Sequence, residues 1–351
     1  MSVSTSPQVV LDKFWANKVD SVVQGLAQLR QQLDAIDEIP QHIIFVSAGE
    51  VKPLLNPDIA AFCQSIRDDF SGEIDFISAA CTSLHASILH FNHSEAISCF
   101  VLFLELDEPI QQGCLDSLGI GLLNDHQHES SPANSGLSVK NSVGFCLLRK
   151  KDPLPQDLVI AQCHIFSQPK GIPGMQQLLK QLVPYLTYAT SPEKVVAFDI
   201  SSSWSTQLKL ALTHHLRQRA HIVSWLASFE TDHHHYLSLK PIFELQNYYQ
   251  HLQKNTLSLL TLGGGGRVGY LTISTQHRLN SSIDNASFDD CNLDQDTAIY
   301  AHSIDVSQYS TPDYHAMVKA NLKYPRLQYR GLNNHYFRWQ YRGFSHAGIK
   351  Q

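Results

Sequence analysis

Cys81 is the residue whose sequence surroundings most clearly favour chemistry. It lies between an apolar run typical of a strand, residues 74–80, and a run typical of a helix, residues 82–91. A thiol in the first turn of a helix faces unpaired backbone N–H groups and the positive end of the helix dipole, which favour its thiolate form. Free cysteines are also often core residues, so the position predicts either a nucleophile or a buried structural cysteine.

Histidines and glycines supply the other candidate groups. His233, His234 and His235 are consecutive and could form part of a site or the polar tip of a loop, whereas residues 214–215 fit the end of an exposed helix. No cysteine or carboxylate stands at a certifiable ligand spacing from these histidines, so we expect no metal site. The four glycines at 263–266 lack the lysine and hydroxyl residue of a P-loop, which favours a structural turn beside the site.

Composition describes an ordinary globular protein with one large or two fused domains. The chain has 351 residues, 43% of them hydrophobic and 17% charged, with a formal net charge of −6. This charge argues against general nucleic-acid binding, and no run approaches the roughly 20 apolar residues that span a bilayer. The N-terminus lacks the features of a secretory signal, and the seven cysteines form no CxxC pair. We therefore expect reduced thiols and a cytoplasmic location.

Hydrophobic patterns alternate between strand and helix along the chain. Residues 9–33 carry apolar side chains at helical spacing, and residues 96–106 form a continuous apolar run expected to be a central strand. Further strands are expected at 42–47, 74–80, 143–148, 158–166, 194–200, 221–225, 257–262 and 267–274, and further helices at 57–68, 82–91, 175–188, 207–217 and 237–252. This order predicts a layered α/β architecture with a similar rhythm in its two halves.

Three segments resemble a known family. Residues 79–90, AACTSLHASILH, resemble the nucleophile turn of the thiolase superfamily, in particular ketoacyl synthase III. Residues 144–150 are similar to the glycine-led strand that closes the family's first half, and residues 262–273 to its glycine-rich turn before the last strand. The resemblance implies a duplicated five-layer αβαβα fold, with residues 1–166 and 167–275 as its halves and residues 276–351 as a C-terminal extension.

The resemblance also implies an activity. Family members move acyl groups: a cysteine takes the acyl group from coenzyme A or an acyl-carrier protein, and a carbanion or another nucleophile then attacks the acyl-enzyme. The implied partners are a coenzyme A thioester or acyl-carrier protein and a second ketoacyl synthase-like subunit, in a homodimer or heterodimer. No permanently bound cofactor is implied, because the acyl-CoA or acyl-phosphopantetheine is itself the substrate.

Two helper side chains normally assist the family's cysteine, and this chain matches only one of them. Aligning Pro241 with a family proline places His234 at the second helper position, next to Cys81 in the expected site. The first helper, a histidine in the family, aligns with Ser202, and a following asparagine aligns with Ser205. His233 and His235 are further auxiliary candidates, and Gly263, Gly264 and Gly265 are candidates for the turn that binds the oxyanion.

These departures leave two functions open. With serine in place of the first helper, acyl transfer to oxygen, nitrogen or sulfur is easier to support than carbon–carbon bond formation, and His234 could activate the Cys81 thiol. The alternative is a catalytically degenerate partner subunit that serves assembly or carrier-protein docking.

The ends of the chain depart from the family as well. Only seven residues precede the first expected helix, so the family's first core strand is predicted to be absent and the first half shortened. Residues 314–351 contain seven Lys or Arg and no Asp or Glu, interleaved with aromatic residues. This segment could dock an acidic carrier protein through Arg326, Arg330 and Arg338, pack against the core or a partner subunit, or bind single-stranded nucleic acid, which the acidic remainder disfavours.

Overall fold

The structure is a computed structural model that describes residues 7–36, 39–48, 56–117, 138–167, 171–188, 193–198, 203–219, 221–226, 234–252, 256–263 and 267–275. The predicted C-terminal extension therefore lies outside the described residues, with Arg326, Arg330 and Arg338. In chain order the elements are β1 (Gln8–Lys18), α1 (Val22–Asp34), β2 (His42–Val46), α2 (Pro57–Asp69), β3 (Glu73–Ile77), η2 (Ala80–Thr82), α3 (Ser83–His93), β4 (Ser98–Glu105), α4 (Glu108–Ser117), β5 (Ser138–Val139), β6 (Ser142–Lys151), β7 (Leu158–Ser167), α5 (Gly171–Tyr188), β8 (Glu193–Phe198), α6 (Ser203–Arg217), β9 (Ile222–Leu226), β10 (His234–His235), η4 (Leu237–Leu239), α7 (Lys240–Asn247), α8 (Tyr249–Leu252), β11 (Leu257–Gly263) and β12 (Arg267–Thr275).

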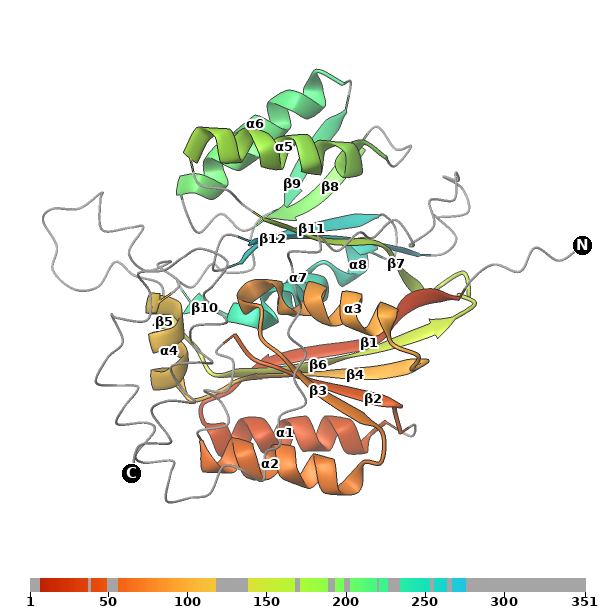
Figure 1. Ribbon diagram of the computed structural model, residues 1–351, viewed down its shortest axis with the longest axis vertical. Helices are drawn as coiled ribbons and strands as arrows, with labels where there is room; N and C mark the ends of the chain where they lie inside the picture. Colours follow the sequence, from red (N-terminus) through yellow and green to blue (C-terminus); the bar gives the residue numbers. More distant parts are fainter. Residues whose placement is uncertain are drawn as a thin grey trace, which may run out of the picture.

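The elements stack in five layers (Figure 1). Helices α1 and α2 cover one outer face, α5 and α6 cover the other, and α3, α7 and α8 lie between the two sheet layers. Three hydrophobic clusters match this arrangement. One fills the middle layer around α3 and α7, and the other two lie beneath the outer helices. The αβαβα layering expected from the resemblance is therefore present.

The strand order shows that the architecture is duplicated. Hydrogen-bonded neighbours run β3-β2-β4-β6-β1 and continue as β7-β12-β11-β8-β9. Listed from the opposite edge, the second set is β9-β8-β11-β12-β7. Position by position, these five strands correspond to β3, β2, β4, β6 and β1. Pairing senses repeat too, because β2 is parallel to β3 and β4 as β8 is to β9 and β11, while β6 and β12 are antiparallel to both of their neighbours.

The two repeats meet at β1 and β7, the first strand of each. Val10 pairs with Val159 and Leu11 with Leu158, which joins both sheets into one hydrogen-bonded ladder. Each of these strands also contains a register shift, after Leu11 in β1 and opposite Thr272 in β7. In this strand order the second repeat begins with β7, which starts at Leu158. The division of the chain into two halves after residue 166 stays a prediction.

The prediction that the first core strand is absent is wrong. Residues 8–18 form β1, a long inner strand paired with β6 along its length, and the helix begins only at Val22. The consecutive residues Val9, Val10 and Leu11 are buried, as in a strand covered on both faces, and such a run cannot be distinguished from a helix by periodicity. Ser21 marks the true helix start, because its hydroxyl accepts a hydrogen bond from the Gln24 amide.

Two glycines let the middle layer approach the sheets. A Cβ on Gly144 of β6 would lie 2.6 Å from both the Leu239 side chain and the Trp15 carbonyl oxygen. A Cβ on Gly269 of β12 would lie 2.7 Å from the imidazole ring of His85. Both glycines are the third residue of equivalent strands, so the same device seats η4 on the first sheet and α3 on the second.

No helix among the described residues is long and apolar enough to cross a membrane.

Candidate active site

Cys81 lies in a tight connection between β3 and α3, at the centre of the middle layer. The preceding residue, Ala80, has a φ of 49°, a left-handed conformation that costs an alanine about 1 to 2 kcal/mol. Residues 80–82 then form a single 3₁₀ turn that leads directly into α3. The cysteine is fully buried, and so is most of the helix that follows it. The predicted strand-to-helix junction at Cys81 is thus present.

Local hydrogen bonds hold this turn. The Ser83 hydroxyl accepts from the Ala79 amide at 2.9 Å and donates to the Ala80 carbonyl at 2.7 Å, while the Thr82 hydroxyl donates to the Ala79 carbonyl at 2.6 Å. No side chain caps the N-terminus of α3 among the described residues. The positive end of a buried helix therefore faces Cys81 without a carboxylate to neutralise it.

His235 is the histidine that contacts the cysteine. Its Nε2 atom lies 3.3 Å from the Cys81 Sγ atom, and both residues are fully buried. The sequence alignment had placed His234 next to Cys81, with His235 as an auxiliary candidate. Among the described side chains it is His235 that makes this contact.

The turn that follows His235 has the same form as the turn at Cys81. Leu237 has a φ of 45°, residues 237–239 form a 3₁₀ turn, and α7 follows, as α3 follows η2. In the repeated strand order α3 and α7 occupy equivalent places, which makes Ser238 the counterpart of Cys81. The duplication thus brings two strand-to-helix turns together, one carrying the thiol and the other preceded by the histidine.

Glu105 links the second turn to the first sheet. Its Oε1 atom accepts from the Ala48 amide at 2.8 Å, from the Ser238 amide at 3.3 Å and from the Ser238 hydroxyl. Its Oε2 atom is buried without a hydrogen-bond partner among the described residues. Burial raises the pKa of Glu105 from 4.5 to about 7, although the Ser238 hydroxyl and the nearby His235 oppose this. Glu105 was not among the site residues predicted from the sequence. The sequence feature that marks it is a single carboxylate at the end of the apolar run that forms β4.

His85 lies one helical turn after Cys81 and behaves as a neutral core residue. It is fully buried, its ring packs against Gly269, and neither ring nitrogen has a partner among the described residues. Burial, with a smaller contribution from His164, lowers the pKa of His85 from 6.5 to about 3. His85 therefore fixes the distance between α3 and β12 and carries no charge at neutral pH.

The other described cysteines whose pKa is shifted are structural. Burial raises the pKa of Cys63, Cys99 and Cys146 well above the ordinary value, and all three are in the core. Their thiols therefore stay protonated at physiological pH.

Several predicted site residues cannot be placed. Ser202, His233, Gly264 and Gly265 lie outside the described residues. Ser205 lies in α6, Gly263 ends β11, and His234 pairs with Ser138 in the short β10–β5 sheet, but the structure does not describe their side chains. Their roles as helpers or oxyanion donors stay predictions.

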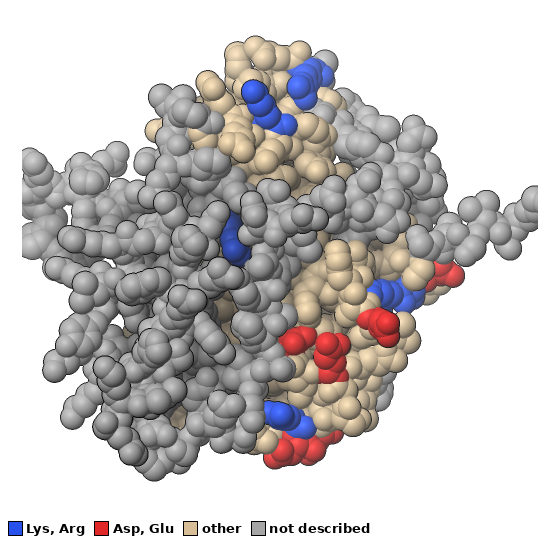
Figure 2. Space-filling view, viewed as in Figure 1, with Lys and Arg blue, Asp and Glu red and all other residues tan. Residues whose placement is uncertain are grey.

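The described charges are unevenly placed on the face in Figure 2. Asp and Glu side chains lie in the lower right, with Lys and Arg beside them, and the upper part shows Lys and Arg without acidic neighbours.

Comparison with known proteins identifies the fold. No protein-family model matches the chain, and neither does any curated protein. A variant of OleA from Xanthomonas campestris is similar with a TM-score of 0.50 at 11% identity, over 76% of this chain and 98% of that one. The PfaC ketosynthase–chain length factor has a TM-score of 0.49 at 11% identity, over 70% of this chain and 37% of that one. A ketosynthase from module 6 of the bacillaene synthase of Bacillus subtilis has a TM-score of 0.47 at 12% identity, over 67% and 54%.

Two of these neighbours are described as ketosynthases. At such low identity the similarity concerns the fold, and the similarity to OleA agrees with the five layers and the repeated strand order found in this chain. The protein therefore shares a duplicated αβαβα fold with OleA.

Proposed function

We propose that this protein is an acyltransferase or condensing enzyme that works through an acyl-Cys81 intermediate, with His235 as the acid–base partner. The observation that carries the proposal is the 3.3 Å contact between the Cys81 Sγ and His235 Nε2 atoms at the uncapped N-terminus of a buried helix. A base within reach and the N-terminus of a helix are two of the means by which proteins activate a thiol nucleophile.

The chemistry balances with these two side chains. The Cys81 thiol gives its proton to His235 Nε2, and the thiolate attacks the carbonyl carbon of a thioester. The bond between that carbon and the donor sulfur then breaks, and the departing thiolate takes the proton from the imidazolium. An acceptor nucleophile reverses these steps, and the backbone N–H of Cys81 is our candidate donor to the oxyanion in both tetrahedral intermediates.

The proposed acyl donors are coenzyme A and acyl-carrier-protein thioesters, used in fatty acid, polyketide or related biosynthesis. Acyl transfer to a heteroatom is favoured over condensation, because the chain has no histidine between residues 194 and 213, where the first helper is expected. We propose that the active form pairs with an identical or ketoacyl synthase-like subunit.

The same missing helper supports a second candidate function. A partner subunit that has lost catalysis would retain the fold and the core turn at Cys81 while serving assembly or carrier-protein docking. In that case Cys81 could be replaced without loss of pathway activity, whereas an enzyme would lose its activity.

Intact-protein mass spectrometry separates the two functions. The protein is incubated with a panel of acyl-CoA and acyl-carrier thioesters, and Cys81→Ala is compared with Cys63→Ala, which removes a thiol from the hydrophobic cluster beneath the outer helices α1 and α2. An enzyme gains the mass of one acyl group, keeps that gain in Cys63→Ala and loses it in Cys81→Ala. No gain with any donor in folded protein would refute the acyl-enzyme and favour the partner-subunit function.

A further inference from the structure

A second group of chemistry-bearing side chains lies at the far end of α3. His42 is the first residue of β2, Asp75 lies in β3, and His90 lies in the last turn of α3. Nine residues separate His90 from Cys81, which is about 13 Å along a helix. This group is therefore distinct from the Cys81–His235 pair.

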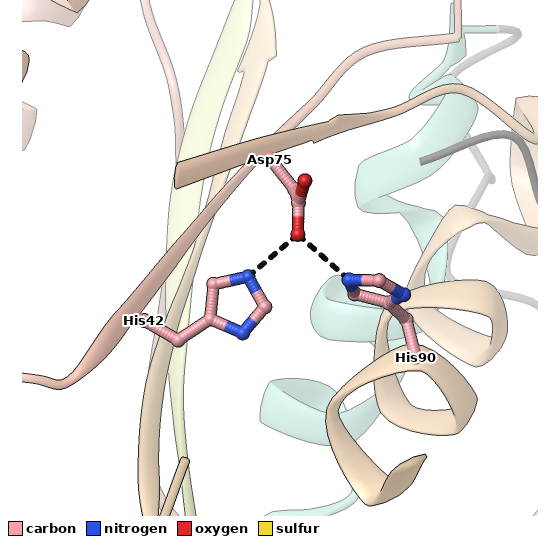
Figure 3. Close-up of side chains that lie close together, drawn as sticks. All are labelled: His42, Asp75 and His90. Carbon is pink, nitrogen blue, oxygen red and sulfur yellow. Dashed lines mark hydrogen bonds and ion pairs between the residues drawn. The ribbon is translucent and has the colours of Figure 1, made fainter. Parts of the chain in front are cut away.

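Two imidazoles converge on one carboxylate oxygen (Figure 3). The Nε2 atoms of His42 and His90 lie 2.9 Å and 2.7 Å from the same Oδ2 atom of Asp75. One ligand atom from each residue falls within 4.8 Å of the others. The His42 side chain is fully buried, that of Asp75 is 10% exposed, and that of His90 is 24% exposed, so solvent reaches the group from the helix side.

The side chain of Asp75 is nearly buried, and its closest polar neighbours are the two imidazole nitrogens. A carboxylate in such a place needs a partner of positive charge, and two imidazole nitrogens beside it are donors that can hold a metal ion there.

We propose that His42, Asp75 and His90 form a site for a divalent transition-metal ion of the zinc class. Two imidazoles and one carboxylate are a recurrent ligand set for zinc, with a fourth position filled by water. Ligand atoms about 2.0 to 2.1 Å from a tetrahedral ion lie about 3.3 Å apart. The two contacts to Oδ2 would therefore open by about half an ångström, and the two nitrogens, which lie within 4.8 Å of each other, would move to the same spacing.

The ion would stabilise the position of α3, the helix that follows Cys81. It would cross-link the first residue of β2 and the middle of β3 to the last turn of this helix. These three residues were not among the sequence candidates, because they are separated by 33 and 15 residues and form no spacing pattern.

The experiment measures zinc binding to the full chain after any affinity tag has been cleaved off. The chain carries Cys81→Ala, which removes the Cys81–His235 pair as a competing zinc site. Calorimetric titration with Zn²⁺ gives stoichiometry and affinity, Co²⁺ absorption reports the ligand geometry, and thermal unfolding reports stabilisation. His90→Gln and Asp75→Asn test the ligands. His93→Gln is the matched control, because His93 lies on the same helix, and its Nδ1 atom lies 3.3 Å from the Leu89 carbonyl oxygen.

The proposal expects one equivalent of bound zinc, a tetrahedral cobalt spectrum and a zinc-dependent rise in Tm. His90→Gln and Asp75→Asn should weaken zinc binding by at least 100-fold and abolish the rise in Tm, while His93→Gln should change neither. Absence of saturable binding by the folded parent, or equal affinity in His90→Gln and His93→Gln, would overturn the proposal and leave an ion-paired cluster only.

Discussion

Replacing Glu105 by glutamine should make the protein more stable at alkaline pH. The carboxyl is fully buried, and its pKa is raised from 4.5 to about 7, so the folded state binds a proton that the unfolded state has already released. The stability that the protonated Glu105 carboxyl contributes is therefore fully present below pH 4.5 and is lost as the pH rises through 7. The whole loss is about 3 kcal/mol, because one pKa unit corresponds to about 1.4 kcal/mol.

The Glu105→Gln variant removes this titration while keeping an oxygen that can accept from Ala48 and Ser238. Urea unfolding of both proteins between pH 4.5 and 8.5 yields the difference in their free energies of unfolding, in which the titration of all other groups largely cancels. We expect the variant to gain about 2 to 3 kcal/mol relative to the parent across this range. Glu95→Gln is the control, because it makes the same replacement at an exposed glutamate.

A flat difference for Glu105→Gln would refute this reasoning, because it would mean that the carboxyl ionises as easily in the folded as in the unfolded state. A variant that loses stability as the pH rises would refute it more strongly, since the charged form would then be the stabilising one.

The remaining predictions concern other parts of the site. The parent should lose stability as the pH falls from 6.5 toward 3, because the unfolded state protonates His85 while the folded state keeps it neutral. His85→Leu should remove this loss. Between pH 6.5 and 4.5 the loss is about 3 kcal/mol, which urea unfolding of the two proteins measures. Gly144→Ala should destabilise the protein by about 1 to 3 kcal/mol, since its Cβ would collide with backbone at Trp15; unfolding at neutral pH tests this, and an unchanged midpoint would contradict the close approach. His235→Ala should slow acyl-Cys81 formation by about 10²-fold or more, followed by quenched-time mass spectrometry, whereas His215→Ala should leave the rate unchanged. Equal rates in these two variants would remove His235 from the mechanism.

The parts of the fold that were predictable were those with an unambiguous hydrophobic signal. The run in β4 and the change of pattern at Cys81 identified a central strand and a strand-to-helix junction, and both are present. The start of the chain was assigned incorrectly, because Val9 to Leu11 fit a helix as well as a doubly covered strand. Only pairing with residues 142–151 decides between the two, and pairing over that distance leaves no local trace.

The site was predictable only to within one residue. The sequence indicated a histidine in the 233–235 run, but which ring reaches Cys81 depends on how β10 pairs with β5, a sheet of two residues per strand. Glu105 and Ser238 meet across the duplication, and so do the two left-handed turns at Ala80 and Leu237. Such meetings are set by tertiary packing, and single-sequence patterns do not contain them.

The position of β1 has a consequence for synthesis of the protein on the ribosome. Gln8 to Lys18 is translated before the other strands of its sheet, yet its neighbours in the sheet are β6 and β7, which begin at Ser142 and Leu158. At typical rates of 5 to 20 residues per second, β1 waits roughly 6 to 25 s before the first residues of β6 are made. Among the strands described, β1 is thus made before the others and is among the last to gain its partners, and its apolar residues stay without them throughout that interval.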